Sequence, residues 1–264
     1  TVVGFDENFN YDRVMNKADG FIGKLTHLIT PNEDTALFFQ KRFKTIPVKA
    51  LGHPTLETYM QKIGNTNRMD IQRRLNLDVT KPTVLYVGGL GNGYGKAYEA
   101  FCKAVASMKN ANILFLPHPK TNGEIEKRIL LEHPEHQIQT LDPNIGIETA
   151  LAVSDIVAFH DSTMSVQALF AGKQVLHIGN PIAQTETSKF EPAVARNLAK
   201  RYKSVVDIRQ GLMAAIDHYK KQSAAVHQIR TNNLNKLLGI PTNSTERITD
   251  YLLSLVKAPK TEAL

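Results

Sequence analysis

The chain of 264 residues has a single cysteine and no apolar run near the roughly 20 residues that a membrane-spanning helix needs. A single cysteine excludes an internal disulfide, and because Cys102 lies within an amphipathic helical pattern we expect a buried structural thiol. No secretory signal opens the sequence, and because it begins with Thr1 rather than Met we expect further sequence upstream. These absences favour a cytoplasmic protein.

Several signatures of catalytic chemistry are absent as well. The chain has no Gly-Lys-Ser/Thr triplet of a P-loop, no HExxH motif or cysteine pair of a zinc site, and no GxSxG nucleophile elbow. A metal site drawing on His118, His160, Asp161 and His177 is an open alternative, as is a hydrolytic triad around Ser162, but neither has the spacing of a known motif. We therefore expect no metal and no hydrolytic triad.

Positive charge is the main excess. Lysine and arginine number 32 against 25 acidic residues, which gives a net charge of +7 and favours a polyanionic partner. The densest basic group lies on predicted helix surfaces and comprises Lys200, Arg201, Lys203, Lys220 and Lys221. We interpret it as a solvated face and expect no nucleic-acid partner, whereas contact with an acidic inner-membrane face stays an alternative.

From about residue 83 onward, short apolar strands alternate with helices, which predicts an α/β fold with a doubly wound parallel sheet. Strands are predicted at Thr83–Val87, Asn112–Leu116, Gln137–Leu141, Asp155–Phe159, Gln174–Ile178 and Ser204–Val206. Helices are predicted between them at Lys96–Met108, Glu124–Glu132, Gly146–Val153 and Ser162–Ala171, and later at Gln210–Lys221, Ser223–Leu238 and Ser244–Val256.

The opening of the chain has a different pattern, with strands at Thr26–Ile29 and Val48–Leu51 around a helix at Asn32–Phe43. We interpret residues 1–52 as the remnant of another α/β domain and residues 53–81 as a linker. The main domain then covers residues 82–243, and residues 244–264 form a last helix and tail.

Three turns that follow predicted strands are suited to anions. The first, Gly88–Gly93, follows the first strand and allows a ligand to approach the backbone at Gly89, Gly91 and Asn92. The second is Pro117-His118-Pro119-Lys120, in which His118 can donate to a phosphate or act as an acid beside the Lys120 cation.

The third turn, His160-Asp161-Ser162-Thr163, ends the fourth strand and offers hydroxyls at the start of a helix. Carboxyl ends of parallel strands line one edge of a sheet, where such proteins bind ligands. We therefore expect the three turns to form one phosphate-binding crevice.

These residues resemble glycosyltransferases of the GT-B type and the related UDP-N-acetylglucosamine 2-epimerases, over roughly residues 26–256. Leu51-Gly52-His53-Pro54 looks like the exit from the first domain of those enzymes. Pro117-His118-Pro119-Lys120 with Asp161-Ser162-Thr163 looks like the paired motifs of bacterial sialyltransferases, Kdo transferases and glycerophosphotransferases.

The resemblance implies that His118, Ser162 and Thr163 contact the phosphates of a nucleotide-activated donor, with the Gly89 and Gly91 backbone beside them. It also implies a nucleoside site that includes His160, Asp161 and Gln167. Many retaining members carry Glu where this chain has Gln167, and the motif is Asp-Ser-Thr rather than Ser-Ser.

The expected function is metal-independent transfer of a sugar or sugar-like group from a nucleotide donor to a surface carbohydrate or lipid acceptor. A UDP-sugar 2-epimerase and a non-catalytic nucleotide- or carbohydrate-binding module stay open as alternatives. The nucleotide sugar is a substrate, so no cofactor is expected. The acids Asp6, Glu7 and Asp12 are candidates for the base only by position.

Overall fold

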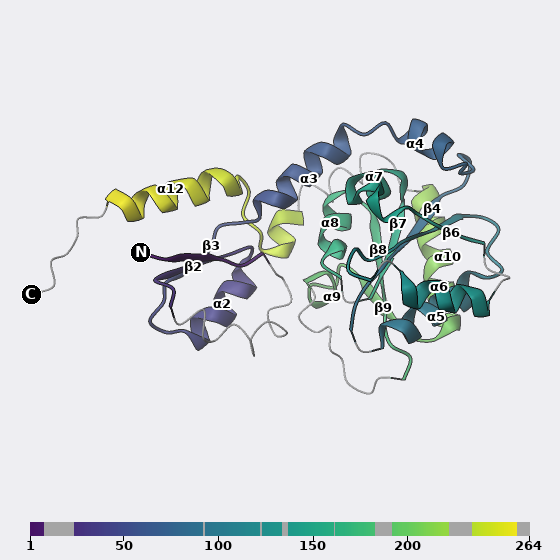
Figure 1. The fold of residues 1–264 in the computed structure, drawn as a ribbon, viewed down its shortest axis with the longest axis horizontal. Helices are drawn as coiled ribbons and strands as arrows, with labels where there is room; N and C mark the ends of the chain where they lie inside the picture. Colours follow the sequence, from purple (N-terminus) through teal and green to yellow (C-terminus); the bar gives the residue numbers. More distant parts are fainter. Residues whose placement is uncertain are drawn as a thin grey trace, which may run out of the picture. The chain divides into compact units, whose positions relative to one another are not determined.

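The computed structural model describes residues 1–7, 24–91, 93–121, 123–133, 137–160, 162–182, 192–221 and 234–257. The chain divides into two compact units, Thr1–Thr58 with Asn233–Leu264, and Tyr59–Asn232. Figure 1 labels the elements of both units, and α3 (Pro54–Gly64) carries the chain from one to the other. The domain boundaries expected from the sequence stay a prediction.

The smaller unit is built on a parallel sheet of three short strands in the order β1-β2-β3. Its elements are β1 (Val3–Phe5), β2 (His27–Thr30), α2 (Glu33–Arg42), β3 (Val48–Ala50) and α12 (Ser244–Lys257). Helix α2 begins where the Asn32 side chain accepts a hydrogen bond from the Thr35 amide at 3.0 Å. Figure 1 shows α2 and α12 on opposite sides of this sheet. Strand β1 was not among the predicted strands.

Hydrogen bonds join the loop after β3 to the start of α12. Gly52 has φ +103°, and a Cβ there would lie 2.1 Å from the Ser244 Oγ, so the position requires glycine. The Ser244 hydroxyl donates to Glu57 Oε1 and accepts from the His53 amide, both at 2.9 Å. The predicted start of the last helix at Ser244 is confirmed.

The larger unit is a six-stranded sheet in which every pair of neighbouring strands is parallel, in the order β6-β5-β4-β7-β8-β9. Its strands are β4 (Thr83–Val87), β5 (Asn112–Leu116), β6 (Ile138–Thr140), β7 (Ile156–Phe159), β8 (Gln174–Ile178) and β9 (Lys200–Tyr202). Its helices are α4 (Arg68–Arg74), α5 (Tyr94–Val105), α6 (Glu124–Glu132), the 3₁₀ turn η1 (Pro143–Ile145), α7 (Ile147–Val153), α8 (Met164–Phe170), α9 (Pro192–Ala195) and α10 (Val205–Lys221). The predicted doubly wound sheet is confirmed.

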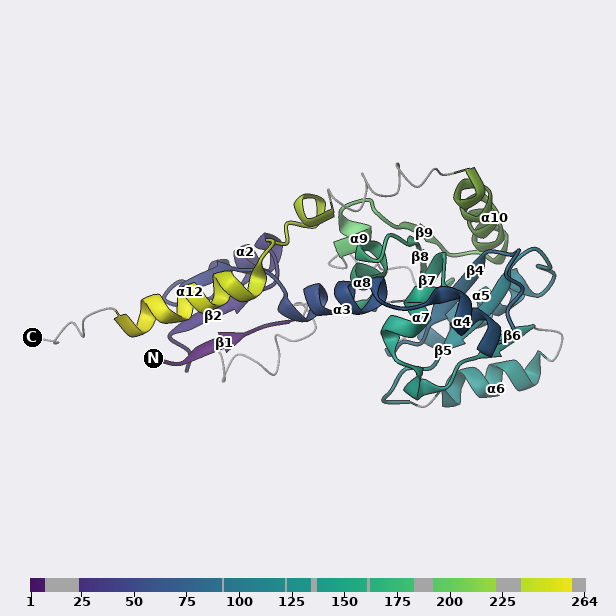
Figure 2. The same ribbon diagram turned by 90° about the horizontal axis from the view of Figure 1, so that it is seen from above.

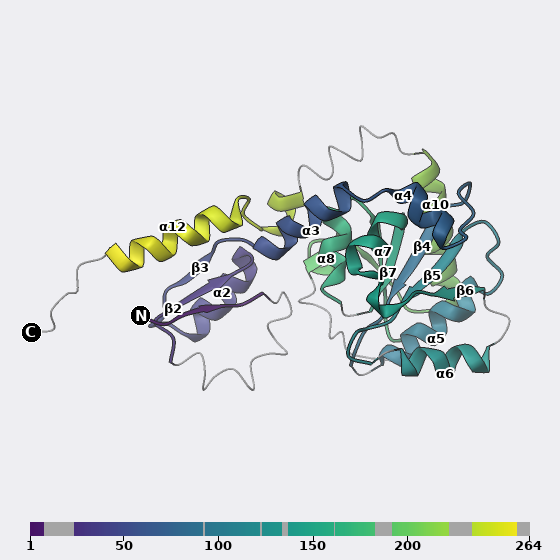
Figure 3. The same ribbon diagram turned by 45° about the horizontal axis from the view of Figure 1, so that its top comes forward.

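Helices cover both faces of this sheet, as Figures 2 and 3 show. Alternate strand residues such as Tyr86, Phe115 and Ala158 pack with α5, α6 and α10 in one large apolar cluster. On the other face lie α7 and α8, which contact β4, β7 and β8. Because both faces are covered, strands such as β4 are buried along their whole length.

The strand predicted at Ser204–Val206 is wrong. The edge strand β9 lies earlier, at Lys200–Tyr202, and Val205 is already the first residue of α10. The Ser204 hydroxyl accepts from the Asp207 amide at 3.0 Å and donates to the Asp207 carboxylate at 2.7 Å, which is a reciprocal helix cap. This cap overrides the strand preference of two adjacent valines.

The basic group around Lys200 was expected on helix surfaces, and part of this prediction is wrong. Lys200 and Arg201 lie on the edge strand β9 rather than on a helix surface. Charged side chains on an edge strand hinder its pairing with another chain, which gives Lys200 and Arg201 a structural role of their own. Of the predicted helix at Ser223–Leu238, residues 234–238 are helical and the rest lie outside the described residues.

Candidate functional site

The three predicted turns meet at the carboxyl edge of the larger sheet. Val87 at the end of β4 pairs with Leu116 of β5 and with Phe159 of β7, so the turns leave these strands at the same level. A Cβ on Gly88 would lie 2.4 Å from the His118 amide nitrogen, and one on Gly89 would lie 2.8 Å from the His160 carbonyl oxygen. Glycine at both positions therefore lets the three turns pack against one another.

The glycine turn ends in the left-handed conformation that starts α5. Gly91 has φ +106° and is exposed, and Gly93 has φ +86° and is the N-cap residue of α5. A Cβ on Gly93 would lie 2.2 Å from Nδ2 of Asn180, which follows β8. Sequence reasoning missed Asn180, although Gly179-Asn180-Pro181 after a predicted strand is a recognisable turn signal.

His118 is half-buried, and its tautomer is set by its own turn. The Lys120 backbone amide donates to His118 Nδ1 at 3.1 Å, so in the neutral ring the proton lies on Nε2. Burial lowers the pKa of His118, and the Lys120 charge lowers that pKa further. His118 is therefore suited to act as a neutral Nε2–H donor beside the exposed Lys120 side chain.

The third turn contributes hydroxyls ahead of α8. Ser162 Oγ accepts from the Met164 amide at 3.3 Å, which leaves its own hydrogen available to a ligand. Thr163 is exposed and makes no side-chain cap. One turn further along α8, Gln167 Oε1 is buried and has no hydrogen-bond partner in the part of the chain that the structure describes.

His160 lies beneath this turn rather than at its surface. It is 3% exposed, and its Nδ1–H donates to the Ile178 carbonyl of β8 at 2.7 Å. Its ring therefore supports the turn, and the nucleoside role expected for it stays a prediction. Asn92 and Asp161, which were also expected in the site, lie outside the described residues.

Two further searches bear on the chemistry. Among the described residues, no group of three or more His, Cys, Asp and Glu could hold a metal ion. Among the described helices, none is both long enough and apolar enough to cross a bilayer. Of the acids named as candidate bases, Glu7 is exposed and Asp6 is half-buried in the smaller unit, and Asp12 lies outside the described residues.

No protein-family model and no curated protein sequence matches the chain. Solved structures do. The UDP-GlcNAc 2-epimerase of Neisseria meningitidis, bound to UDP-GlcNAc, superposes with a TM-score of 0.62 at 15% identity, covering 87% of this chain and 62% of that one.

The MnaA–UDP structure from S. aureus gives a TM-score of 0.64 at 14% identity, over 96% of this chain and 69% of that one. The wall teichoic acid polymerase TagF gives 0.58 at 13% identity, over 93% and 61%. The chain has the Rossmann-like GT-B fold. At these identities the likeness extends to the fold alone, and the chain spans about three fifths of the Neisseria epimerase and of TagF.

Proposed function

We propose that this chain binds a nucleotide-activated sugar at the carboxyl edge of its larger sheet and serves in glycosyl transfer to a surface carbohydrate or lipid acceptor. The observation that supports this most is the close packing of Gly88 on His118 and of Gly89 on His160. It gathers a glycine turn, a histidine donor and two hydroxyls within one small region.

In the proposed reaction the acceptor hydroxyl oxygen forms a bond to the anomeric carbon of the sugar, and the bond from that carbon to the donor phosphate breaks. The nucleotide leaves with the electron pair, and the proton of the acceptor hydroxyl passes to solvent or to the leaving phosphate. The His118 Nε2–H, the Lys120 ammonium and the hydroxyls of Ser162 and Thr163 stabilise the charge that grows on the leaving phosphate. The Gly91 backbone lies beside them. In this proposal the electrostatic catalysis uses no metal, and the Gln167 amide hydrogen-bonds a ribose hydroxyl.

A UDP-sugar 2-epimerase is the second candidate, because two of the similar structures hold UDP or UDP-GlcNAc. That reaction needs carboxylates near the sugar. Glu99 is held by Lys103 at 2.6 Å and Lys96 at 3.0 Å, and Glu126 is fully buried. Glu124, in the first turn of α6, is exposed, and Asp161 and Glu186 lie outside the described residues. We therefore favour transfer.

The first test is a thermal-shift titration of the purified chain with CMP, CDP, UMP, UDP, GDP and ADP. We expect one base to stabilise the chain, and we expect His118→Ala and Ser162→Ala to lose that stabilisation. His133→Ala, at the far end of α6, is the matched control and should keep it. Equal shifts in all variants would place the nucleotide elsewhere.

A second test separates the three functions with the nucleotide sugar of the preferred base. A transferase releases nucleotide only when an acceptor is present, and an epimerase converts the sugar without one. A binding module binds the donor and does neither. Conversion of UDP-GlcNAc to its 2-epimer without acceptor would overturn the transferase proposal.

A further inference from the structure

One buried side chain, Tyr94, contacts two of the three turns of the candidate site and the helix that follows the third. It is the first residue of α5 and is 1% exposed. A Cβ on Gly89 would lie 3.0 Å from the edge of the Tyr94 ring, and the His160 ring centroid lies 6.2 Å from that of Tyr94. Tyr94 therefore packs against the turn after β4 and the turn after β7.

The link to α6, the helix that follows the turn after β5, is a hydrogen bond. The Tyr94 hydroxyl donates to Glu126 Oε1, and Glu126 lies in the first turn of α6. That helix begins at the left-handed Gly123, which ends the loop that carries His118 and Lys120. The Tyr94–Glu126 bond thus spans the two helices that follow the glycine turn and the histidine turn.

The chemistry of this pair argues for more than packing. Glu126 is fully buried, and its Oε2 has no hydrogen-bond partner among the described residues. Burying a carboxylate costs several kcal/mol, and apolar side chains of similar volume often stabilise such a position better. Burial, neighbouring Tyr86 and the Glu126 carboxylate all raise the pKa of Tyr94 far above its usual value, so Tyr94 stays protonated and remains a donor.

We propose that Tyr94 is a positioning residue whose hydroxyl bond to Glu126 fixes the spacing between the glycine turn and the His118 turn. This inference rests on the proposed function for its consequence, which is that donor phosphates meet a preorganised set of groups. Tyr94 itself touches no ligand in this scheme.

The closing experiment compares Tyr94→Phe with Tyr98→Phe. Tyr98 is equally buried, lies one turn further along α5 and has its ring 6.4 Å from that of Tyr94. Its hydroxyl is close to Cys102 and feels the charge of Glu126, but it makes no hydrogen bond to Glu126 or to any other described residue. Each variant removes one oxygen and keeps the ring. Amide hydrogen exchange over residues 88–95 and 118–123, without ligand, reads out the order of the two turns directly.

We expect Tyr94→Phe to speed exchange in both segments and to weaken binding of the preferred nucleotide by about 10-fold, the scale of one hydrogen bond to a charged group. Tyr98→Phe should leave both readouts near the parent values. Unchanged exchange in Tyr94→Phe, or an equal change in Tyr98→Phe, would overturn the inference.

The double variant Tyr94→Phe/Glu126→Met separates positioning from stability. It leaves no buried carboxylate without a donor, so thermal stability should recover while exchange and affinity stay altered. Recovery of all three would reduce the pair to a stability effect. If the parent binds no nucleotide, the proposed function fails, and the exchange comparison still decides the positioning role.

Discussion

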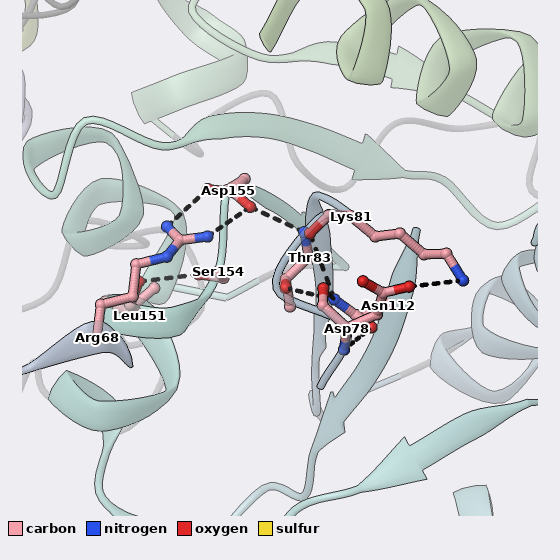
Figure 4. Close-up of polar contacts among 8 residues, drawn as sticks. All are labelled: Arg68, Asp78, Lys81, Thr83, Asn112, Leu151, Ser154 and Asp155. Atoms are coloured by element: carbon pink, nitrogen blue, oxygen red, sulfur yellow. Dashed lines mark hydrogen bonds and ion pairs between the residues drawn. The ribbon is translucent and has the colours of Figure 1, made fainter. Parts of the chain in front are cut away.

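The larger sheet is built in opposite ways at the amino edge, where its parallel strands begin, and at the carboxyl edge, where they end. At the amino edge, side chains close off the strand starts, as Figure 4 shows. Arg68 donates to both oxygens of Asp155 at 2.7 and 2.8 Å, and Asp155 Oδ2 also accepts from the Thr83 amide at 2.8 Å. Asn112 at the start of β5 donates to the Asp78 carbonyl at 2.9 Å. These groups satisfy one another.

At the carboxyl edge, glycines replace side chains, and the polar groups keep free capacity. His118 uses one ring nitrogen within its turn, Ser162 accepts but has a hydrogen left to donate, and Gln167 Oε1 is unpaired among the residues described. The comparison indicates that the amino edge contributes stability and that the carboxyl edge contributes ligand chemistry.

Removal of Asp155 should give the largest effect on stability. Asp155→Ala leaves the buried Thr83 amide and the Arg68 guanidinium without their acceptor. Because the Arg68 side chain is 33% exposed, we expect a cost at the low end of that for a buried pair, about 3 kcal/mol. Denaturant unfolding measures this loss. Asp70→Ala, which breaks an exposed pair with Arg73 on the same helix as Arg68, should change stability by less than about 1 kcal/mol. Nucleotide affinity of the folded Asp155 variant should be unchanged, and a parallel loss of affinity would contradict the division between edges.

Gly93→Ala tests the opposite edge. The new Cβ would meet Asn180 Nδ2 at 2.2 Å on a backbone with φ +86°, so we expect weaker nucleotide binding together with destabilisation of about 1–2 kcal/mol. Gly95→Ala is the matched control, because its Cβ meets only Ile125 at 3.4 Å and lies inside the helix. The control should keep parent affinity. Gly93→Ala combined with Asn180→Ala should recover part of the loss, since the contacts with Asn180 Nδ2 and Cγ are removed while the Cβ contact at 2.9 Å and the strained φ remain.

Apolar periodicity and chain order predicted much of this fold. The bounds of β4, β5, β8 and α6 were confirmed, because continuous apolar strands and a helix between polar turns have clear ends. Helix α10 was predicted to begin too late, because the Ser204–Asp207 cap is a local hydrogen-bond feature that outweighs valine preference.

The site was predictable only to the level of its turns. The glycine turn, His118 and Ser162 follow strands whose parallel order the sequence implies, so their meeting was foreseeable. Asn180 and the Tyr94–Glu126 pair were missed, because their contacts depend on how α5 packs against β8 and α6. Tyr94 reads in the sequence as one more apolar residue near a helix start.

His118→Ala sharpens the comparison within the carboxyl edge. Loss of one charge-assisted hydrogen bond to phosphate should weaken nucleotide binding by about 10-fold or more. His118→Gln keeps an N–H donor and should retain most of the affinity if the ring acts as a neutral Nε2–H donor. Titration calorimetry at pH 7.5 measures both. Equal losses in the two variants would contradict the role of His118 as a neutral N–H donor to phosphate.

The smallest expected effect is the pH dependence that His118 confers on stability. Its folded pKa is lowered, by burial first and then by the Lys120 charge, below the value of about 6.5 for an unfolded histidine. Between those two values the unfolded chain binds more protons, so stability is fully present above about pH 6.5 and is lost as the pH falls through the folded pKa. His118→Gln removes this contribution, whereas buried His53, whose pKa is also lowered, titrates in both proteins.

The difference in unfolding free energy between parent and His118→Gln should therefore shift against the parent between pH 7.5 and pH 5. A difference that shifts in favour of the parent on acidification would mean that a carboxylate, rather than Lys120, dominates the surroundings of His118.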